Sequence, residues 1–155
     1  MGTYTPSIAP LAELLEIAHG QYHQLVLATV EADSTSHWQD VAAALEGRYL
    51  NLNLELSQRL LDIPQRQWSH KAVELIDAVV LSTDLRVTLL HRIEILFEHQ
   101  LQLDPLKSLQ QIARRHGLLV VWPGTYDGRY LTYAEPWHPE YCRYLTKDLI
   151  VFPSA

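Results

Sequence analysis

The 155-residue chain has little that would tie it to an oxidising compartment or to a membrane. Its single cysteine, Cys142, excludes an intramolecular disulfide, which is typical of proteins in the reducing cytoplasm. The N-terminus lacks the basic start and the continuous apolar core of a signal peptide. No apolar run reaches the roughly 18 residues that a membrane-spanning helix requires. We therefore expect a soluble, cytoplasmic protein.

A surplus of positive charge is also absent. The formal net charge is −6, which argues against a broad nucleic-acid-binding surface but leaves local basic patches open. Internal repeats and low-complexity linkers are missing too, and this length suits one domain with a buried core. We expect a single domain over residues 1–155, with an N-terminal helix in residues 1–20 and an aromatic-rich segment in residues 125–155.

The hydrophobic pattern near the N-terminus predicts a strand, a polar turn and a helix in succession. Residues 25–30 form a short apolar run, typical of a strand that is buried on both faces. Residues 31–37 are mostly polar and form the turn. The helix that follows carries its apolar residues on one face, namely Trp38, Val41, Ala42 and Leu45.

Strands and helices alternate along the rest of the chain. Further strands are expected over residues 49–53, 85–91 and 118–122, with strand-like pieces near 130–134 and 144–152. Helices are expected over residues 8–19 and 56–61, after an N-cap at Ser69, and after the N-cap and proline of Asp104–Pro105. This alternation predicts an α/β fold, a three-layer sandwich around five mostly parallel strands.

The turn after the first strand resembles a phosphate-binding loop in length and position but not in residues. Such loops use glycines, a lysine and a hydroxyl group on Mg²⁺ at the start of a helix. Here Glu31 and Ser36 replace the glycines, His37 replaces the lysine, and Trp38 replaces the hydroxyl residue. Glycines are needed because the backbone must approach the phosphates closely. The favoured interpretation is therefore a plain strand-to-helix turn, in which Asp33, Ser34 or Ser36 caps the helix.

Three runs of residues occur in an order that is characteristic of one protein family. They are YLNLNLELSQRLL at 49–61, IEILF at 93–97 with DPL at 104–106, and the segment from YLTYAEP to HPEY at 130–141. In these runs the chain resembles the BrxF family, the small P-loop protein of BREX type III phage-exclusion systems. The resemblance extends from about residue 25 to the C-terminus. It implies a P-loop NTPase fold, with the strand at 118–122 between those at 25–30 and 85–91, and a role in phage defence.

The resemblance also implies nucleotide-binding residues that this chain lacks. A glycine-rich turn of the GPPGSGKT kind is expected at 31–38, and an acidic residue that helps to hold Mg²⁺ is expected at the end of the third strand. EADSTSHW and His91 stand there instead, and Glu94 lies three residues beyond the strand end. We therefore predict a degenerate, non-catalytic P-loop protein without an ATP/Mg²⁺ cofactor, acting as a regulatory or scaffolding component. The alternatives are a divergent ATP-binding or ATPase switch subunit and a nucleic-acid-binding accessory protein.

Two histidines are the only candidates for a metal site. His37 and His91 are expected at the carboxyl ends of strands, where open α/β sheets bind ligands. With Glu31 or Glu94 they could supply ligands to a metal ion. Two histidines from separate loops are a weak signal, however, and solvated loop residues are the favoured interpretation. We expect no metal.

The C-terminal segment interleaves aromatic residues with arginines, a pattern that can stack nucleic-acid bases. The candidate contact residues are Arg129, Tyr130, Trp137 and Arg143. Because the chain has no strong basic stripe, contacts with other proteins are favoured over nucleic acid. These proteins would be defence-system components or a second copy of the chain. No nucleophile–base arrangement or nucleophile elbow is recognisable, so the sequence predicts no reaction.

Overall fold

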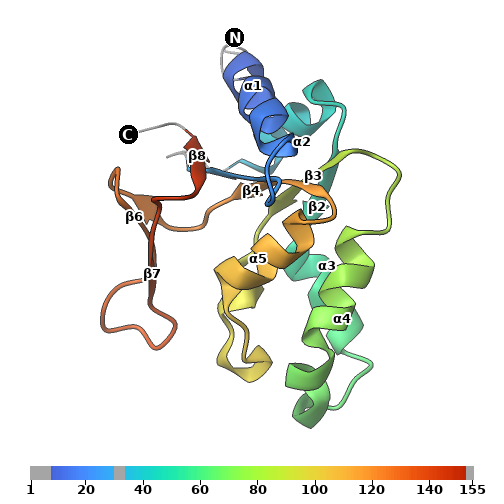
Figure 1. Ribbon diagram of the computed structural model, residues 1–155. Coiled ribbons are helices and arrows are strands. Elements are labelled where there is room, and N and C mark those ends of the chain that lie inside the picture. The colour runs from blue at the N-terminus through green and yellow to red at the C-terminus, as the bar shows by residue number, and fades with distance from the viewer. Residues whose placement is uncertain (1–7, 30–33, 153–155) are drawn as a thin grey trace.

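The computed structural model describes residues 8–29 and 34–152. A five-stranded parallel sheet crosses the middle of the molecule (Figure 1). Its strands are β1 (Leu25–Ala28), β2 (Arg48–Asn51), β3 (Val87–His91), β4 (Gly117–Val121) and β8 (Ile150–Phe152). In the order β2-β3-β4-β1-β8, the strand β4 is hydrogen-bonded to β1 on one side and to β3 on the other. The predicted parallel sheet and the predicted position of the fourth strand are confirmed.

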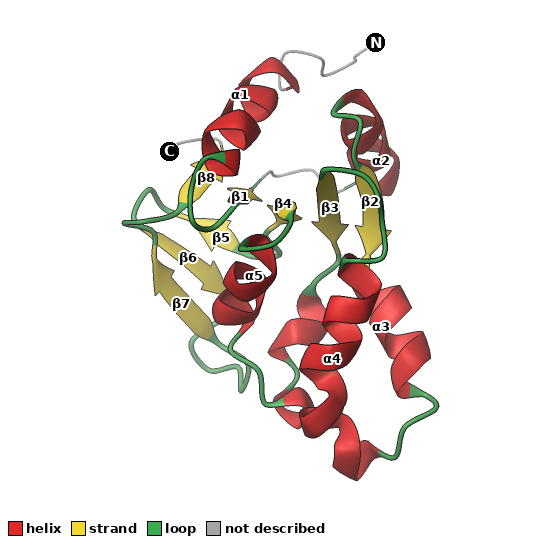
Figure 2. Cartoon of the chain, turned by 45° about the vertical axis from the view of Figure 1, so that its right-hand side comes forward, coloured by secondary structure: helices red, strands yellow, loops and turns green. Residues whose placement is uncertain are grey.

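Helices cover both faces of this sheet (Figure 2). On one face α1 (Ile8–His19) and α2 (Thr35–Ala44) share a core with the strands. On the other face lie α3 (Leu52–Leu60), α4 (Trp68–Val80) and α5 (Pro105–Ala113). Short 3₁₀-helices span Gln65–Gln67 (η2), Glu94–Phe97 (η3) and His99–Leu101 (η4). Because successive strand residues point to opposite faces, a sheet covered on both sides needs apolar residues at almost every position.

The central strand β4 is the longest fully buried strand of this sheet. All five of its residues are buried, and Leu118, Leu119 and Val120 are fully enclosed. Burying one such aliphatic side chain contributes about 1.5–3 kcal/mol relative to leaving it exposed. The centre of the sheet is therefore stabilised from both layers of helices at once.

Capping side chains set several helix boundaries. The carboxylate of Asp104 accepts a hydrogen bond from the Lys107 N–H at 3.3 Å, which confirms the predicted start of α5. The side chain of Asn51 caps α3 in the same way, accepting from the Leu54 N–H at 3.0 Å. The strand that was predicted to reach residue 53 therefore ends at Asn51.

The predicted start of α4 at an N-cap Ser69 is wrong. The helix begins at Trp68, directly after the 3₁₀-helix η2. The Trp68 indole N–H donates to the carbonyls of Leu60 at 3.2 Å and Ile63 at 2.9 Å. This contact joins the end of α3 and the turn after it to the start of α4, so a side-chain bond across the turn, not a cap at Ser69, accompanies the boundary.

A second sheet, which the sequence analysis does not predict, lies beside α5 (Figure 2). Its antiparallel strands are β5 (Thr125–Tyr126), β6 (Tyr130–Tyr133) and β7 (Cys142–Leu145), in the order β5-β6-β7. The piece predicted near residues 144–152 is thus divided between the two sheets. A turn in which the Leu149 N–H donates to the Thr146 carbonyl at 3.0 Å separates β7 from β8.

Aromatic rings attach the small sheet to the main core. Phe97 stacks on Tyr133 with ring centroids 3.8 Å apart and meets Trp122 edge-on at 5.6 Å. Trp122 in turn meets Tyr144 edge-on at 6.0 Å and donates its indole N–H to the Thr132 carbonyl at 3.0 Å. Burial raises the pKa of both tyrosine hydroxyls. Tyr133 and Tyr144 of the C-terminal segment therefore have a structural role.

The path from β4 into the small sheet depends on Gly124. A Cβ at this position would overlap the backbone carbonyl of Thr132, which cannot move aside as a flexible side chain could. We expect Gly124→Ala to lower the free energy of unfolding by about 1–3 kcal/mol. Gly20→Ala is the matched control, because its Cβ would lie 3.7 Å from the nearest atom, the Ile17 carbonyl oxygen. Urea unfolding measures both variants, and equal effects would contradict the prediction.

Candidate functional site

The carboxyl edge of the main sheet gathers most of the residues singled out in the sequence. Open α/β sheets bind ligands at this edge, where loops and helix N-termini converge. His91 ends β3 and pairs in register with Asn51 at the end of β2. The first turn of α2 brings His37 and Trp38 to the same place, with the Trp38 ring 6.4 Å from the His91 ring. We call these rings, with that of Tyr49, the edge cluster.

The start of α2 is closed by a side-chain cap. Of the three candidate caps, Ser34 is the N-cap, and its hydroxyl accepts a hydrogen bond from the His37 N–H at 3.3 Å. The same hydroxyl lies 3.0 Å from that of Ser36. Because the helix begins at Thr35, Ser36 and His37 belong to its first turn rather than to the preceding loop. The cap engages one of the N–H groups that a helix start offers to an anion; Glu31 lies outside the described residues.

Trp38 is a core residue. Only 1% of it is exposed, and it packs with Val41, Ala42 and residues of β1 and β4 in one hydrophobic cluster. Its ring meets that of His37 edge-on, with centroids 4.9 Å apart. Within the described residues, its indole N–H has no hydrogen-bond partner. An indole has no oxygen for Mg²⁺, which prefers oxygen ligands. The position at which the resemblance implies an Mg²⁺-binding hydroxyl is therefore occupied by a buried indole ring.

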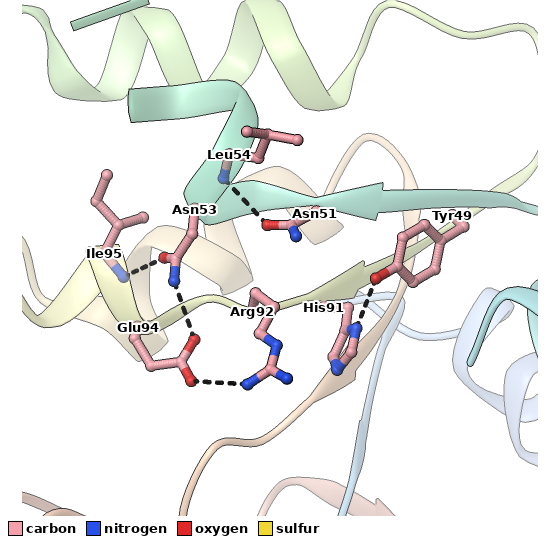
Figure 3. A network of polar contacts seen from close by, with 8 residues as sticks. All are labelled: Tyr49, Asn51, Asn53, Leu54, His91, Arg92, Glu94 and Ile95. Carbon is pink, nitrogen blue, oxygen red and sulfur yellow. Dashed lines mark hydrogen bonds and ion pairs between the residues drawn. The ribbon is translucent and has the colours of Figure 1, made fainter. Parts of the chain in front are cut away.

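His91 is held from the neighbouring strand. It is 1% exposed, and the Tyr49 hydroxyl shares a hydrogen bond of 2.6 Å with its Nδ1 (Figure 3). The two rings meet edge-on at 5.6 Å. Where the resemblance implies a carboxylate for Mg²⁺, the structure thus has a buried imidazole fixed by a phenol.

Glu94 is engaged in a second polar network (Figure 3). Its carboxylate accepts from the Asn53 amide at 3.3 Å and lies 3.9 Å from the Arg92 guanidinium. Asn53 also accepts from the Ile95 N–H at 2.7 Å and donates its own N–H to the Arg92 carbonyl at 2.9 Å. Arg92 has the left-handed backbone conformation, with φ of 56°. Asn53 thereby fixes the turn after β3 against the start of α3.

The weak metal candidate of His37, His91 and Glu94 is not assembled. Across residues 8–29 and 34–152, no three His, Cys, Asp or Glu side chains are grouped so that they could hold a metal ion. The sequence analysis missed Asn53, because it placed this residue in a strand. The available signal was Asn51 two residues earlier, because asparagine is a preferred N-cap and would start a helix that contains Asn53.

The C-terminal candidates divide into two groups. The Arg143 guanidinium carbon lies 3.7 Å from the centroid of the Tyr130 ring, and that of Arg129 lies 5.9 Å from it. Trp137 lies in the loop between β6 and β7 with 81% of its surface exposed, and it makes none of these contacts. The structure therefore brings together Arg129, Tyr130 and Arg143 but leaves Trp137 apart.

A cleft of about 310 Å³ lies at the opposite edge of the sheet, where β3 and β4 begin. It is lined by both acidic and basic side chains, and Arg86 pairs with Glu16 at 3.6 Å beside it. Both partners of this pair are largely exposed, so it contributes little. The cleft is far from the strand ends at which α/β sheets place their ligand sites.

No protein-family model, curated protein or solved structure matches this chain. Among the helices of the described residues, none has the length and apolar character needed to cross a membrane.

The Tyr49–His91 bond predicts a measurable contribution to stability. Tyr49→Phe removes the hydroxyl from a buried nitrogen, and leaving such a group without this bond costs about 1–3 kcal/mol. Tyr130→Phe is the matched control, because no hydrogen bond of the Tyr130 hydroxyl exists within the described residues. Urea unfolding compares the two, and a Tyr49→Phe variant as stable as Tyr130→Phe would contradict the assigned bond.

Proposed function

We propose that this chain is a P-loop-type protein of the BrxF family whose nucleotide site has lost its chemistry. In this proposal it is a regulatory or scaffolding component of a phage-defence system and acts through protein contacts. The placement of β4 between β1 and β3 supports the P-loop type, because the resemblance implies that order. The three family-like runs support the membership and hence the role in defence.

The burial of Trp38 and His91 is the observation that carries the loss of nucleotide chemistry. Each is 1% exposed, and the two stand where the Mg²⁺-binding hydroxyl and the acidic residue are expected. Neither supplies an oxygen ligand, and Tyr49 engages Nδ1 of His91 at 2.6 Å. At position 37 a histidine replaces the fixed lysine cation. Of the features that bind phosphate, only the start of α2 remains, and Ser34 already caps it.

Direct titration tests this proposal. We expect isothermal titration calorimetry with Mg-ATP to give no saturable heat at physiological nucleotide concentrations, and we expect no hydrolysis. Micromolar binding that is weakened by His37→Ala or Ser36→Ala would overturn the proposal. The divergent ATPase switch would then be the better description, with the ion pair of Arg92 and Glu94 just beyond the end of β3.

Restoring the missing groups tests whether the fold is of the P-loop type. Replacing residues 31–38 by GPPGSGKT, together with His91→Asp, should restore Mg-ATP binding because the strand end and the start of α2 are already in place. The matched control has the same replacement with His37→Ala instead of His37→Lys, and it should not bind.

The loss of Trp38 is the physical risk of this replacement. Removing a buried tryptophan costs about 3–5 kcal/mol. Circular dichroism must therefore show that both variants are folded before the titration. A folded replacement variant that still does not bind Mg-ATP would show that the phosphate-binding turn is not at residues 31–38.

A further inference from the structure

Within the described residues, the outer strand β7 of the small sheet pairs with a neighbour on one side only. The Thr146 N–H donates to the Arg129 carbonyl at 2.9 Å, and these residues continue the register in which Tyr130 pairs with Leu145. In antiparallel pairs, hydrogen-bonded and non-hydrogen-bonded positions alternate. The backbone groups of Arg143 and Leu145 therefore point away from β6, at the open side of β7.

The other side of β6 confirms this alternation. The Asp127 N–H donates to the Tyr130 carbonyl at 3.2 Å, so the backbone of Tyr130 faces β5 and not β7. Arg143 and Leu145 are both exposed, and 50% of Leu145 is accessible. No other strand pairs with β7 within the described residues. An exposed strand edge of this kind can accept an additional strand.

The outer face next to this edge is basic. Arg143, Tyr130 and Leu145 lie on one face of the sheet, and the guanidinium groups of Arg143 and Arg129 both lie over the Tyr130 ring. In the described part of the chain, neither arginine forms an ion pair. The nearby carboxylate of Asp127 accepts the backbone N–H groups of Arg129 and Tyr130 at 2.9 and 2.7 Å. These N–H groups and the Arg143 charge lower the pKa of the Asp127 carboxyl, so one carboxylate offsets part of the positive charge of the two guanidinium groups.

A cleft of about 240 Å³ adjoins the start of β7. Rings and aliphatic groups of Phe97, Leu103, Pro105 and Tyr141 line it, together with the carboxylates of Glu98 and Glu140. These carboxylates disfavour an acidic group in the cleft. The cleft therefore suits an apolar side chain, whereas the outer face suits an acidic one.

We propose that the free edge of β7 binds an extended acidic segment of a partner protein by strand addition. Backbone hydrogen bonds would form with Arg143 and Leu145, and alternate carboxylates of the segment would meet Arg129 and Arg143. This inference rests on the proposed scaffolding function and names the surface and the chemistry of the partner. A second copy of β7 fits less well, because antiparallel pairing would put four guanidinium groups on one continuous face.

Fluorescence anisotropy with the full chain tests the proposal. The probe is a labelled synthetic peptide in which Glu and Val alternate, and the control peptide has Lys in place of Glu. We expect saturable binding of the Glu peptide, weaker binding at high salt, and at least tenfold weaker binding of the Lys peptide. Arg129→Ser combined with Arg143→Ser should weaken binding of the Glu peptide at least tenfold.

Leu145→Pro tests strand addition itself. The Leu145 N–H points away from β6, so proline removes an outward donor without breaking the bonds between β6 and β7. We expect at least tenfold weaker binding, whereas the matched Leu145→Val variant, which keeps the N–H, should bind like the original chain. Circular dichroism confirms that each variant is folded.

Four results would overturn the proposal. The first is anisotropy that stays flat up to the solubility limit of the protein, and the second is peptide binding that Leu145→Pro does not weaken. The third is tighter binding of a labelled oligothymidylate than of the peptide. The fourth is a dimer, seen in sedimentation, that Leu145→Pro dissociates. The last two would assign the surface to nucleic acid and to a second copy. The peptide titration contains no nucleotide. A failure of peptide binding would therefore contradict strand addition to β7, whereas only the Mg-ATP titration tests the loss of nucleotide binding.

Discussion

The hydrogen bonds of β4 to β1 and to β3 are the interaction on which the rest of the structure depends. Because β4 lies between them, β1 and β3 end at the same edge of the sheet with one strand separating them. The helix that follows β1 can then bring Trp38 near His91 without crossing the sheet. The same strand continues into Trp122, whose contacts attach the small sheet. One central strand thus positions both the edge cluster and the basic face of the small sheet.

The sequence was informative where a single local pattern determines the structure. Apolar runs predicted β1 and β4, because a strand covered on both faces must be apolar at nearly every position. The N-caps Ser34 and Asp104 followed from short-range chemistry, since each side chain bonds to an N–H group three residues away. The order of the strands came from the resemblance to a family and not from any pattern of residues.

The sequence was less informative where contacts join distant segments. Asn53 reads locally as a strand residue, but its bonds to Glu94 and Ile95 determine its role, and they span some 40 positions along the chain. The predicted α4 boundary failed for a different reason, because the Trp68 indole bonds to the carbonyl of Leu60 at the end of α3 and to that of Ile63 in the turn after it. The aromatic C-terminal segment gave no indication that it would divide between two sheets.

The edge cluster makes the carboxyl edge of the sheet part of a core. Rings fill the place where a phosphate-binding loop would leave room for ligand, and Trp38 shares the packing of α2 against the sheet. Packing of these rings therefore stabilises the edge of the sheet without any ligand.

The late position of β8 in the chain affects how the main sheet folds during synthesis. β8 pairs with β1, although nearly the whole described chain separates them, and the small sheet lies between β4 and β8. Until β8 emerges from the ribosome, β1 has an open edge with apolar side chains on both faces, which favours wrong pairing. The ring contacts of the small sheet hold this intervening segment compact and so reduce the entropy lost when β8 reaches its place. The chain must therefore protect its first strand through most of its synthesis.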